Sequence, residues 1–215
     1  RLQADMAAGE VPDVAQLPFR AMDFAANSLG AVPMEELAGD EYDEQFSGMY
    51  PNGLALGKLG DLTFRLPFTF STPMLYYNAT LFESAGLDPN DPPETWDEVK
   101  EYALAIKEAN PGVEGIHVAT TGPSSGEWIA QSLIYSNGGE ILSEDRSTIL
   151  LDNEGTVGAM QMLRDLAECG AHGTLTEEEA QEAFLGGNLA MYLQSSALYA
   201  SCADAAEAGG WELRG

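Results

Sequence analysis

The sequence is poor in basic residues, cysteine, histidine and long apolar runs. It holds 9 lysines and arginines against 35 aspartates and glutamates in 215 residues, a formal net charge of −26. A field of this sign repels phosphate backbones and anionic lipid, so we expect no nucleic-acid partner. The two histidines and two cysteines are not spaced along the sequence as the ligands of a metal site are. No run approaches the roughly 18 apolar residues of a membrane-spanning helix.

The few cysteines and the start of the chain limit what can be said about compartment. Cys169 and Cys202 permit one disulfide, and the sequence leaves open whether it forms. The chain begins with Arg1, and no basic and then apolar leader precedes its first helical pattern, so we expect that any targeting segment was removed or lies outside this sequence. Many exposed carboxylates are typical of proteins from a salty habitat, where salt screens their mutual repulsion. We therefore expect lower stability at low ionic strength.

Strand and helix patterns alternate along the chain. Apolar runs bounded by turn residues predict strands at 11–17, 62–68, 73–77, 115–119 and 189–193. Helical periodicity predicts helices at 21–29, 34–38, 95–108, 127–135, 153–168, 177–184 and 197–207. Two of these helices begin with a capping box, Thr95 with Glu98 and Thr176 with Glu179. The alternation predicts an α/β fold with mostly parallel strand pairing.

A Gly-x-Ser-x-Gly pattern around Ser124 follows a predicted strand and precedes a predicted helix. This is the context of a serine hydrolase nucleophile, with His172 as the base and Asp165 or Asp152 to orient it. Small polar residues between a strand and a helix are also common where backbone amides face a ligand. A serine hydrolase therefore stands as the alternative to ligand binding. His117, inside a predicted strand, is interpreted as a core or edge residue.

Three motifs follow one another at fixed spacing between residues 66 and 99. They read LPFTFSTPMLYYN from residue 66, LFESAGLDP from residue 81 and PPETWDEV from residue 92. Further short motifs are GEVPDV from residue 9, NGG from residue 137 and FLGGNLAM from residue 184. Together they closely resemble the family 1 extracellular solute-binding proteins of bacterial ABC importers, and the resemblance spans nearly the whole chain.

The resemblance implies a type II periplasmic-binding-protein fold, in which two α/β lobes are joined by crossing strands and hold a ligand between them. Residues 1–70 match part of the N-terminal lobe, which is incomplete compared with the family, and residues 71–215 match nearly all of the second lobe. The crossover falls at the polar break 69–72. The implied function is capture of a sugar or polyol for a membrane permease, in the periplasm or outside the cell, with or without a lipid anchor. We expect a monomer without catalysis and without a cofactor.

A polyhydroxylated ligand needs aromatic plates for its C–H faces and small polar groups for its hydroxyls. By resemblance, Ser71 matches a ligand-contacting position of the glycerol-3-phosphate-binding branch, and Thr72 lies beside it. Trp128 matches an aromatic stacking position of the maltose-binding relatives. Ser195 and Ser196 stand between a predicted strand and a predicted helix, where hydroxyls and free amides bind a sugar or a phosphate. Core packing for the tryptophan and helix capping for the serines are the alternative interpretations.

Phe19 departs from the glycerol-3-phosphate-binding branch, which carries an acid at the matching position. Phe19 either stacks on a sugar or packs against the protein, so the ligand of that branch does not carry over. The net negative charge weakly disfavours a phosphorylated ligand, although local amides and Arg20 oppose this effect. We expect a neutral or mixed saccharide first, and glycerol phosphates or their diesters next.

Overall fold

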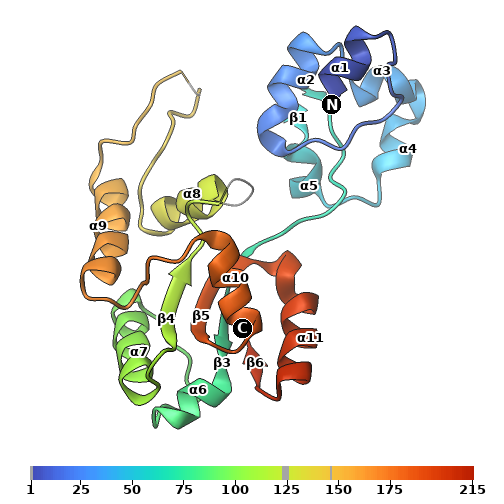
Figure 1. Ribbon diagram of the computed structural model, residues 1–215. Coiled ribbons are helices and arrows are strands. Elements are labelled where there is room, and N and C mark those ends of the chain that lie inside the picture. The colour runs from blue at the N-terminus through green and yellow to red at the C-terminus, as the bar shows by residue number, and fades with distance from the viewer. Residues whose placement is uncertain (1, 123–125, 146) are drawn as a thin grey trace. The chain divides into compact units, whose positions relative to one another are not determined.

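Two units make up the chain, Arg1–Phe70 and Ser71–Gly215 (Figure 1). The computed structural model describes residues 2–122, 126–145 and 147–215. None of the helices in these ranges combines the length and the apolar character that a membrane span requires.

The first unit consists of short helices and one small hairpin. Its helices are α1 (Leu2–Ala7), α2 (Met22–Ser28), α3 (Met34–Ala38), α4 (Tyr42–Phe46) and α5 (Pro51–Ala55), with 3-10 turns η1 (Phe19–Ala21) and η2 (Gly39–Glu41). Strands β1 (Lys58–Leu59) and β2 (Leu62–Thr63) pair antiparallel. The backbone N–H of Thr63 donates to both carboxylate oxygens of Glu35, at 3.1 and 2.9 Å, which ties the hairpin to α3.

One predicted strand of the first unit is wrong, and a second is longer than the strand that the structure shows. Residues 11–17 form no strand, and Val11 and Val14 are 68% and 88% exposed. A buried strand needs a neighbour that satisfies its amides, and the described part of this unit offers only the β1–β2 hairpin. The predicted strand at 62–68 shortens to Leu62–Thr63 because its partner β1 is two residues long. The unit buries no large apolar side chain among its described residues.

The second unit is built on a four-stranded sheet with the order β4-β5-β3-β6. The strands are β3 (Pro73–Asn78), β4 (Glu114–Val118), β5 (Leu189–Ser195) and β6 (Leu213–Arg214). Strands β4 and β5 are parallel, whereas β3 is antiparallel to both β5 and β6. The prediction of mostly parallel pairing is therefore wrong, because apolar periodicity locates a strand but does not encode its direction or its neighbour.

Helices cover and connect these strands. They are α6 (Ala79–Ser84), α7 (Trp96–Ala109), α8 (Gly126–Ser136), α9 (Glu154–Glu168), α10 (Glu177–Leu185) and α11 (Tyr199–Gly209), with a 3-10 turn η3 (Ser196–Leu198). Helix α7 packs on β4, α10 packs on β5 and α11, and α8 packs on α9. Both predicted capping boxes are present, at Thr95 and Thr176. The α/β class is confirmed.

One hydrophobic core lies in the second unit, within the part of the chain that the structure describes. Tyr76 and Tyr192 of the sheet and Phe82 and Phe184 of the helices are fully buried there. The rings of Phe184 and Tyr192 are tilted, with centroids 5.5 Å apart. Aromatic side chains contribute the largest buried areas in such a core. They fix β3 and β5 together, and thereby the position of the residues at the ends of these strands.

Candidate functional site

The sheet brings four predicted hydroxyl residues to one edge of the second unit. Strand β3 begins where β5 ends, since the two are antiparallel and Pro73 faces Ser195 in register. Thr72 and Ser196 lie next to this pair, and the backbone N–H of Thr72 donates to Oγ of Ser196 at 3.0 Å. The N–H of Ser196 donates to the Thr72 carbonyl at 2.9 Å. Ser71 is exposed and adjoins Thr72. We call Ser71, Thr72, Ser195 and Ser196 the hydroxyl edge.

Ser195 and Ser196 each accept a hydrogen bond from a backbone N–H, and neither hydroxyl donates one within the described residues. Oγ of Ser195 accepts from the N–H of Ala197 at 3.2 Å, which caps η3. Oγ of Ser196 accepts from Thr72, as described. A hydroxyl carries one donor and two acceptor lone pairs, so each serine that accepts one bond still has an O–H for a ligand oxygen. The capping interpretation is therefore present in the structure and is compatible with ligand contact.

Trp128 stands near the start of α8, which follows β4. Because β4 runs parallel to β5, the polypeptide leaves β4 at the same end of the sheet at which β5 ends with Ser195. Figure 1 shows the arrowhead of β4 pointing towards α8. Trp128 is partly buried and packs against the core, which agrees with the alternative interpretation of Trp128 as a core-packing residue. Ser124 of the hydrolase pattern lies outside the described residues.

Phe19 belongs to the first unit, and a cation covers one face of its ring. The guanidinium carbon of Arg65 lies 3.6 Å from the ring centroid of Phe19. Burial lowers the pKa of Arg65 from its ordinary value. Phe19 is 40% exposed, so part of the ring remains open to solvent. One function of Phe19 is thus to stack on Arg65.

His172 lacks the free ring nitrogen that a general base needs. Its Nε2 accepts from the backbone N–H of Val118 at 3.1 Å, and its Nδ1 donates to the carbonyl of Gly173 at 2.7 Å. Burial lowers the pKa of His172, and the neighbouring His117 lowers it further. Asp165 accepts from Gln161 at 2.7 Å. The neutral ring is thus a backbone-bonded structural group, which speaks against the hydrolase alternative.

A buried polar cluster that the sequence did not predict as a site lies beside the hydroxyl edge. His117 of β4 and Tyr192 of β5 are register partners, and Gln194 follows two residues later on the same face of β5. Glu177, the first residue of α10, accepts from the Tyr192 hydroxyl and from Nε2 of Gln194 at 2.6 Å. The core interpretation of His117 is confirmed, since it is 2% exposed. Polar residues two apart in an apolar strand were the available signal.

Hydrogen bonding keeps the Glu177 carboxylate charged in this cluster. Burial by itself raises the pKa of Glu177, but hydrogen bonds from His117, Tyr192 and Gln194 outweigh burial and hold the pKa below its ordinary value. Burial raises the pKa of Tyr192, and its bond to Glu177 raises it further. At neutral pH the tyrosine therefore donates to an ionised carboxylate, which is the stronger form of such a bond.

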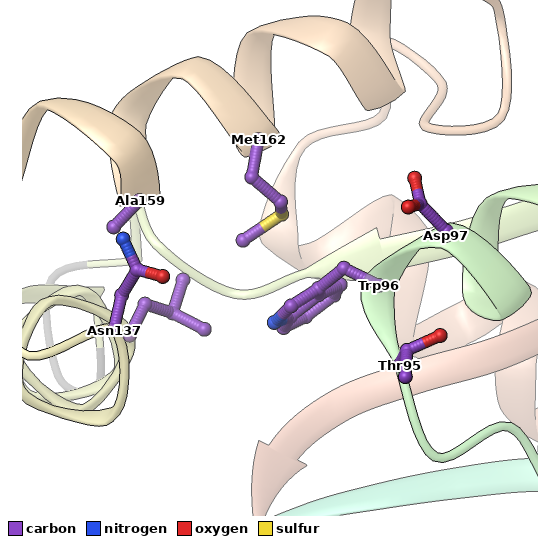
Figure 2. A pocket seen from close by; sticks show the side chains of 7 residues that line it. Thr95, Trp96, Asp97, Asn137, Ala159 and Met162 are labelled. Carbon is purple, nitrogen blue, oxygen red and sulfur yellow. The ribbon is translucent and has the colours of Figure 1, made fainter. Parts of the chain in front are cut away.

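A separate pocket of about 240 Å³ lies between the start of α7, the end of α8 and the middle of α9. Figure 2 shows Trp96, Asn137, Ala159 and Met162 pointing into the same space. Its polar groups are used within the protein: Thr95 caps α7, and Nδ2 of Asn137 donates to the Gly155 carbonyl at 2.8 Å. We interpret this pocket as a packing feature between three helices.

Comparison with known proteins gives three consistent results. The family model for bacterial extracellular solute-binding proteins matches residues 1–211. The sn-glycerol-3-phosphate-binding periplasmic protein UgpB of Escherichia coli K12 is 45% identical over 75 residues, which are 33% of this chain and 16% of UgpB. UgpB from Mycobacterium tuberculosis in complex with glycerophosphocholine has a TM-score of 0.83 at 22% identity, over 99% of this chain and 53% of that one.

A second solved structure agrees. An ABC transporter solute-binding protein from Thermotoga lettingae, bound with α-D-tagatose, has a TM-score of 0.81 at 24% identity, over 99% of this chain and 55% of that one. The chain thus spans about half the length of these two solved relatives. The predicted type II binding-protein fold is confirmed.

Proposed function

Because the chain belongs to the bacterial extracellular solute-binding proteins, we propose that it is part of a receptor that captures a carbohydrate or a glycerol-phosphate-type ligand for an ABC importer. The observation that carries the proposal is the family match over residues 1–211. Within this proposal Ser71–Gly215 forms most of one lobe and Arg1–Phe70 part of the other. The receptor works outside the cytoplasm, in the periplasm or tethered by lipid, and delivers its ligand to a permease.

The hydroxyl edge supports a polyhydroxylated ligand. Its serines offer O–H donors on a rigid strand end, and such small polar groups suit the many hydroxyls of a sugar or polyol. We propose a neutral or mixed saccharide as the first ligand class. The net charge of −26 weakly disfavours an anion. The 45% identity with the E. coli UgpB over 75 residues supports glycerol phosphates or their diesters as the second class.

The proposed work of the receptor is binding alone. Import receptors act because a ligand has different affinities for their open and closed states, and no bond has to break. The blocked ring nitrogens of His172 support this view. A Ser124→Ala variant assayed on ester substrates should lose no activity beyond background. A large drop would favour the hydrolase.

Isothermal titration calorimetry of the longest natural form that contains this chain tests the proposal. The probes are α-D-tagatose, maltose, sn-glycerol 3-phosphate and glycerophosphocholine, and at least one should bind saturably. Ser196→Ala should weaken that binding about tenfold, as expected for one lost hydrogen bond in a desolvated site. Ser201→Ala, an exposed serine of α11, is the matched control. A folded protein that binds none of the four probes would overturn the proposal.

A further inference from the structure

A chain of hydrogen bonds links the first residue of α10 to the turn that carries the two serines. The Glu177 carboxylate accepts from the side-chain amide of Gln194, with 2.6 Å between Oε1 and Nε2. The side-chain carbonyl of Gln194 in turn accepts from the backbone N–H of Ser195 at 2.7 Å. The orientation of the Ser195 peptide therefore depends on Gln194, and the orientation of Gln194 depends on Glu177.

At the Glu177 end of this series of hydrogen bonds, several neighbours hold the carboxylate in place. Tyr192 donates its hydroxyl to Oε1, and Nε2 of His117 lies 3.4 Å from Oε2. Both neighbours are buried, at 0% and 2% exposure. A Cβ atom on Gly122 would come within 3.2 Å of Cγ of Glu177, so the acid also lies against the segment that follows β4. Glu177 thus links β5 to β4 through hydrogen bonds and lies against Gly122.

The Ser195 end is fixed as well. Its backbone groups do not bond to the backbone of β3, because Thr72 and Ser196 form the neighbouring hydrogen-bonded pair and Pro73 and Ser195 the non-bonded one. The Tyr76 hydroxyl donates to the Ser195 carbonyl at 2.9 Å. Tyr76 therefore holds the C=O of Ser195, and the Gln194 side chain holds its N–H, which belongs to the Gln194–Ser195 peptide. A change in the direction of Gln194 would tilt this peptide and move the hydroxyls of Ser195 and Ser196 with it.

We propose that Glu177 is a positioning residue for ligand binding, which acts through Gln194 to set the direction in which the Ser195–Ser196 turn presents its hydroxyls. The proposal rests on the proposed function, because that function makes the hydroxyl edge part of the ligand site. A carboxylate suits this role, since one charged oxygen holds both the Gln194 amide and the Tyr192 hydroxyl. If Glu177 only stabilised the core, its replacement would raise amide exchange uniformly across the second unit.

Amide hydrogen exchange of the 215-residue chain tests the link without any ligand. Glu177→Ala should raise the exchange rate of the Ser195 amide about tenfold more than that of the Ala190 amide, deeper in β5, because only the former loses its partner's support. Glu177→Gln keeps the size and one acceptor oxygen, and should restore much of the protection. Glu178→Ala, at the exposed neighbouring acid, is the matched control. Equal acceleration of both amides, or none, would overturn the proposal.

Gln194→Ala provides the second variant, because it breaks the same link from the other side if Glu177→Ala does not fold. In the longest natural form, titrated with the four probes named above, each single variant should weaken binding about tenfold. The double variant should bind no more weakly than the weaker single one, since both changes remove one shared link. Additive losses, or wild-type affinity in a folded Glu177→Ala protein, would overturn the proposal.

The two proposals fail in different ways. If the wild-type protein binds none of the four probes, the proposed function fails. The exchange experiment then still decides whether Glu177 orients the Ser195 peptide, because it uses no ligand.

Discussion

Gly155 lies so close to Gly139 that a Cβ atom on Gly155 would come within 2.2 Å of the Gly139 backbone nitrogen. This contact packs the first turn of α9 against the turn that follows α8. Asn137 reinforces it, since its side-chain amide donates to the Gly155 carbonyl. The approach of the two backbones therefore requires a residue without a side chain at position 155.

Gly155→Ala should lower the free energy of unfolding of the second unit by about 1 to 3 kcal/mol, the usual cost of forcing a methyl group into filled space. Urea denaturation followed by far-ultraviolet circular dichroism measures the change. Val157→Ala on the same helix is the control, because Val157 is 57% exposed. An unchanged unfolding midpoint in Gly155→Ala would show that the two turns separate easily.

Thr95→Ala should destabilise the second unit by about 1 kcal/mol, as is typical for the loss of an N-cap. The Thr95 hydroxyl accepts from the Glu98 N–H at 3.2 Å, and the Glu98 carboxylate accepts from the Thr95 N–H at 2.9 Å. The same denaturation experiment applies, with the exposed Thr174→Ala as the matched threonine control. Equal stability of the two variants would contradict the capping role.

Stability should fall as the pH drops below 6.5, and His172 should account for part of the fall. Burial lowers the pKa of His172 below its ordinary value of 6.5, so the unfolded chain takes up a proton before the folded chain does. Acid therefore favours the unfolded state between pH 6.5 and the lower folded pKa, and the stabilising contribution is complete above pH 6.5.

Thermal melts at pH 7.5 and pH 5.5 in 1 M salt check this expectation. The difference between the two melting temperatures should be smaller in His172→Gln than in the wild-type chain. Thr95→Ala serves as the control, because it lowers stability without removing a histidine and should keep the wild-type pH dependence. A His172→Gln protein with the wild-type pH dependence would be inconsistent with a lowered pKa of His172 in the folded chain.

The two cysteines should differ sharply in reactivity. Both are free thiols in the structure, which answers the question that the sequence left open; Cys169 is exposed and Cys202 is buried. Burial raises the pKa of Cys202 to about 11. Since the thiolate is the reactive form, Ellman's reagent should titrate one thiol in the native chain and two in guanidinium. Cys169→Ser should abolish the native reaction. No native reaction in the wild-type chain would instead indicate a disulfide.

Trp128→Ala should weaken saccharide binding in the longest natural form by about 1 to 3 kcal/mol, if the ring stacks on the ligand. Trp128→Phe keeps an aromatic face and should recover part of the affinity. Trp211→Phe is the control, since Trp211 contacts Phe184 in the core. Calorimetry measures the affinities, and a Trp128→Ala protein with wild-type affinity would leave Trp128 as a packing residue only.

The 215-residue chain itself should bind the four probes weakly or undetectably. It spans about half the length of its two solved relatives, and we expect the proposed site to need groups outside these 215 residues. Micromolar affinity of this chain alone would contradict the expectation. Calorimetry of the chain beside its longest natural form makes the comparison.

The sequence predicted those features that depend on neighbouring residues. The capping boxes at Thr95 and Thr176, and the strands that begin near Pro73 and Leu189, follow from local patterns and are present. Thr72, Ser195 and Ser196 were predicted one by one, and the antiparallel register of β3 and β5 brings them together. Their contact with a ligand stays a prediction.

The features that the sequence did not predict depend on distant residues. The local sequence of residues 11–17 does not indicate whether another strand lies beside them. Glu177 has the pattern of a first-turn helix acid, and only the fold places it against Tyr192 and Gln194. The pairing direction of β3 is likewise a property of the whole sheet.

Strand β6 has only two residues, and it covers the outer side of β3 at Tyr77 and Asn78. Arg214 secures it, with a guanidinium nitrogen 2.7 Å from the Pro89 carbonyl. A chain cut before Leu213 would leave that side of β3 as an uncovered row of amides and carbonyls, which another molecule's strand can join. We therefore expect a fragment that ends before Leu213 to self-associate more readily than one that keeps β6.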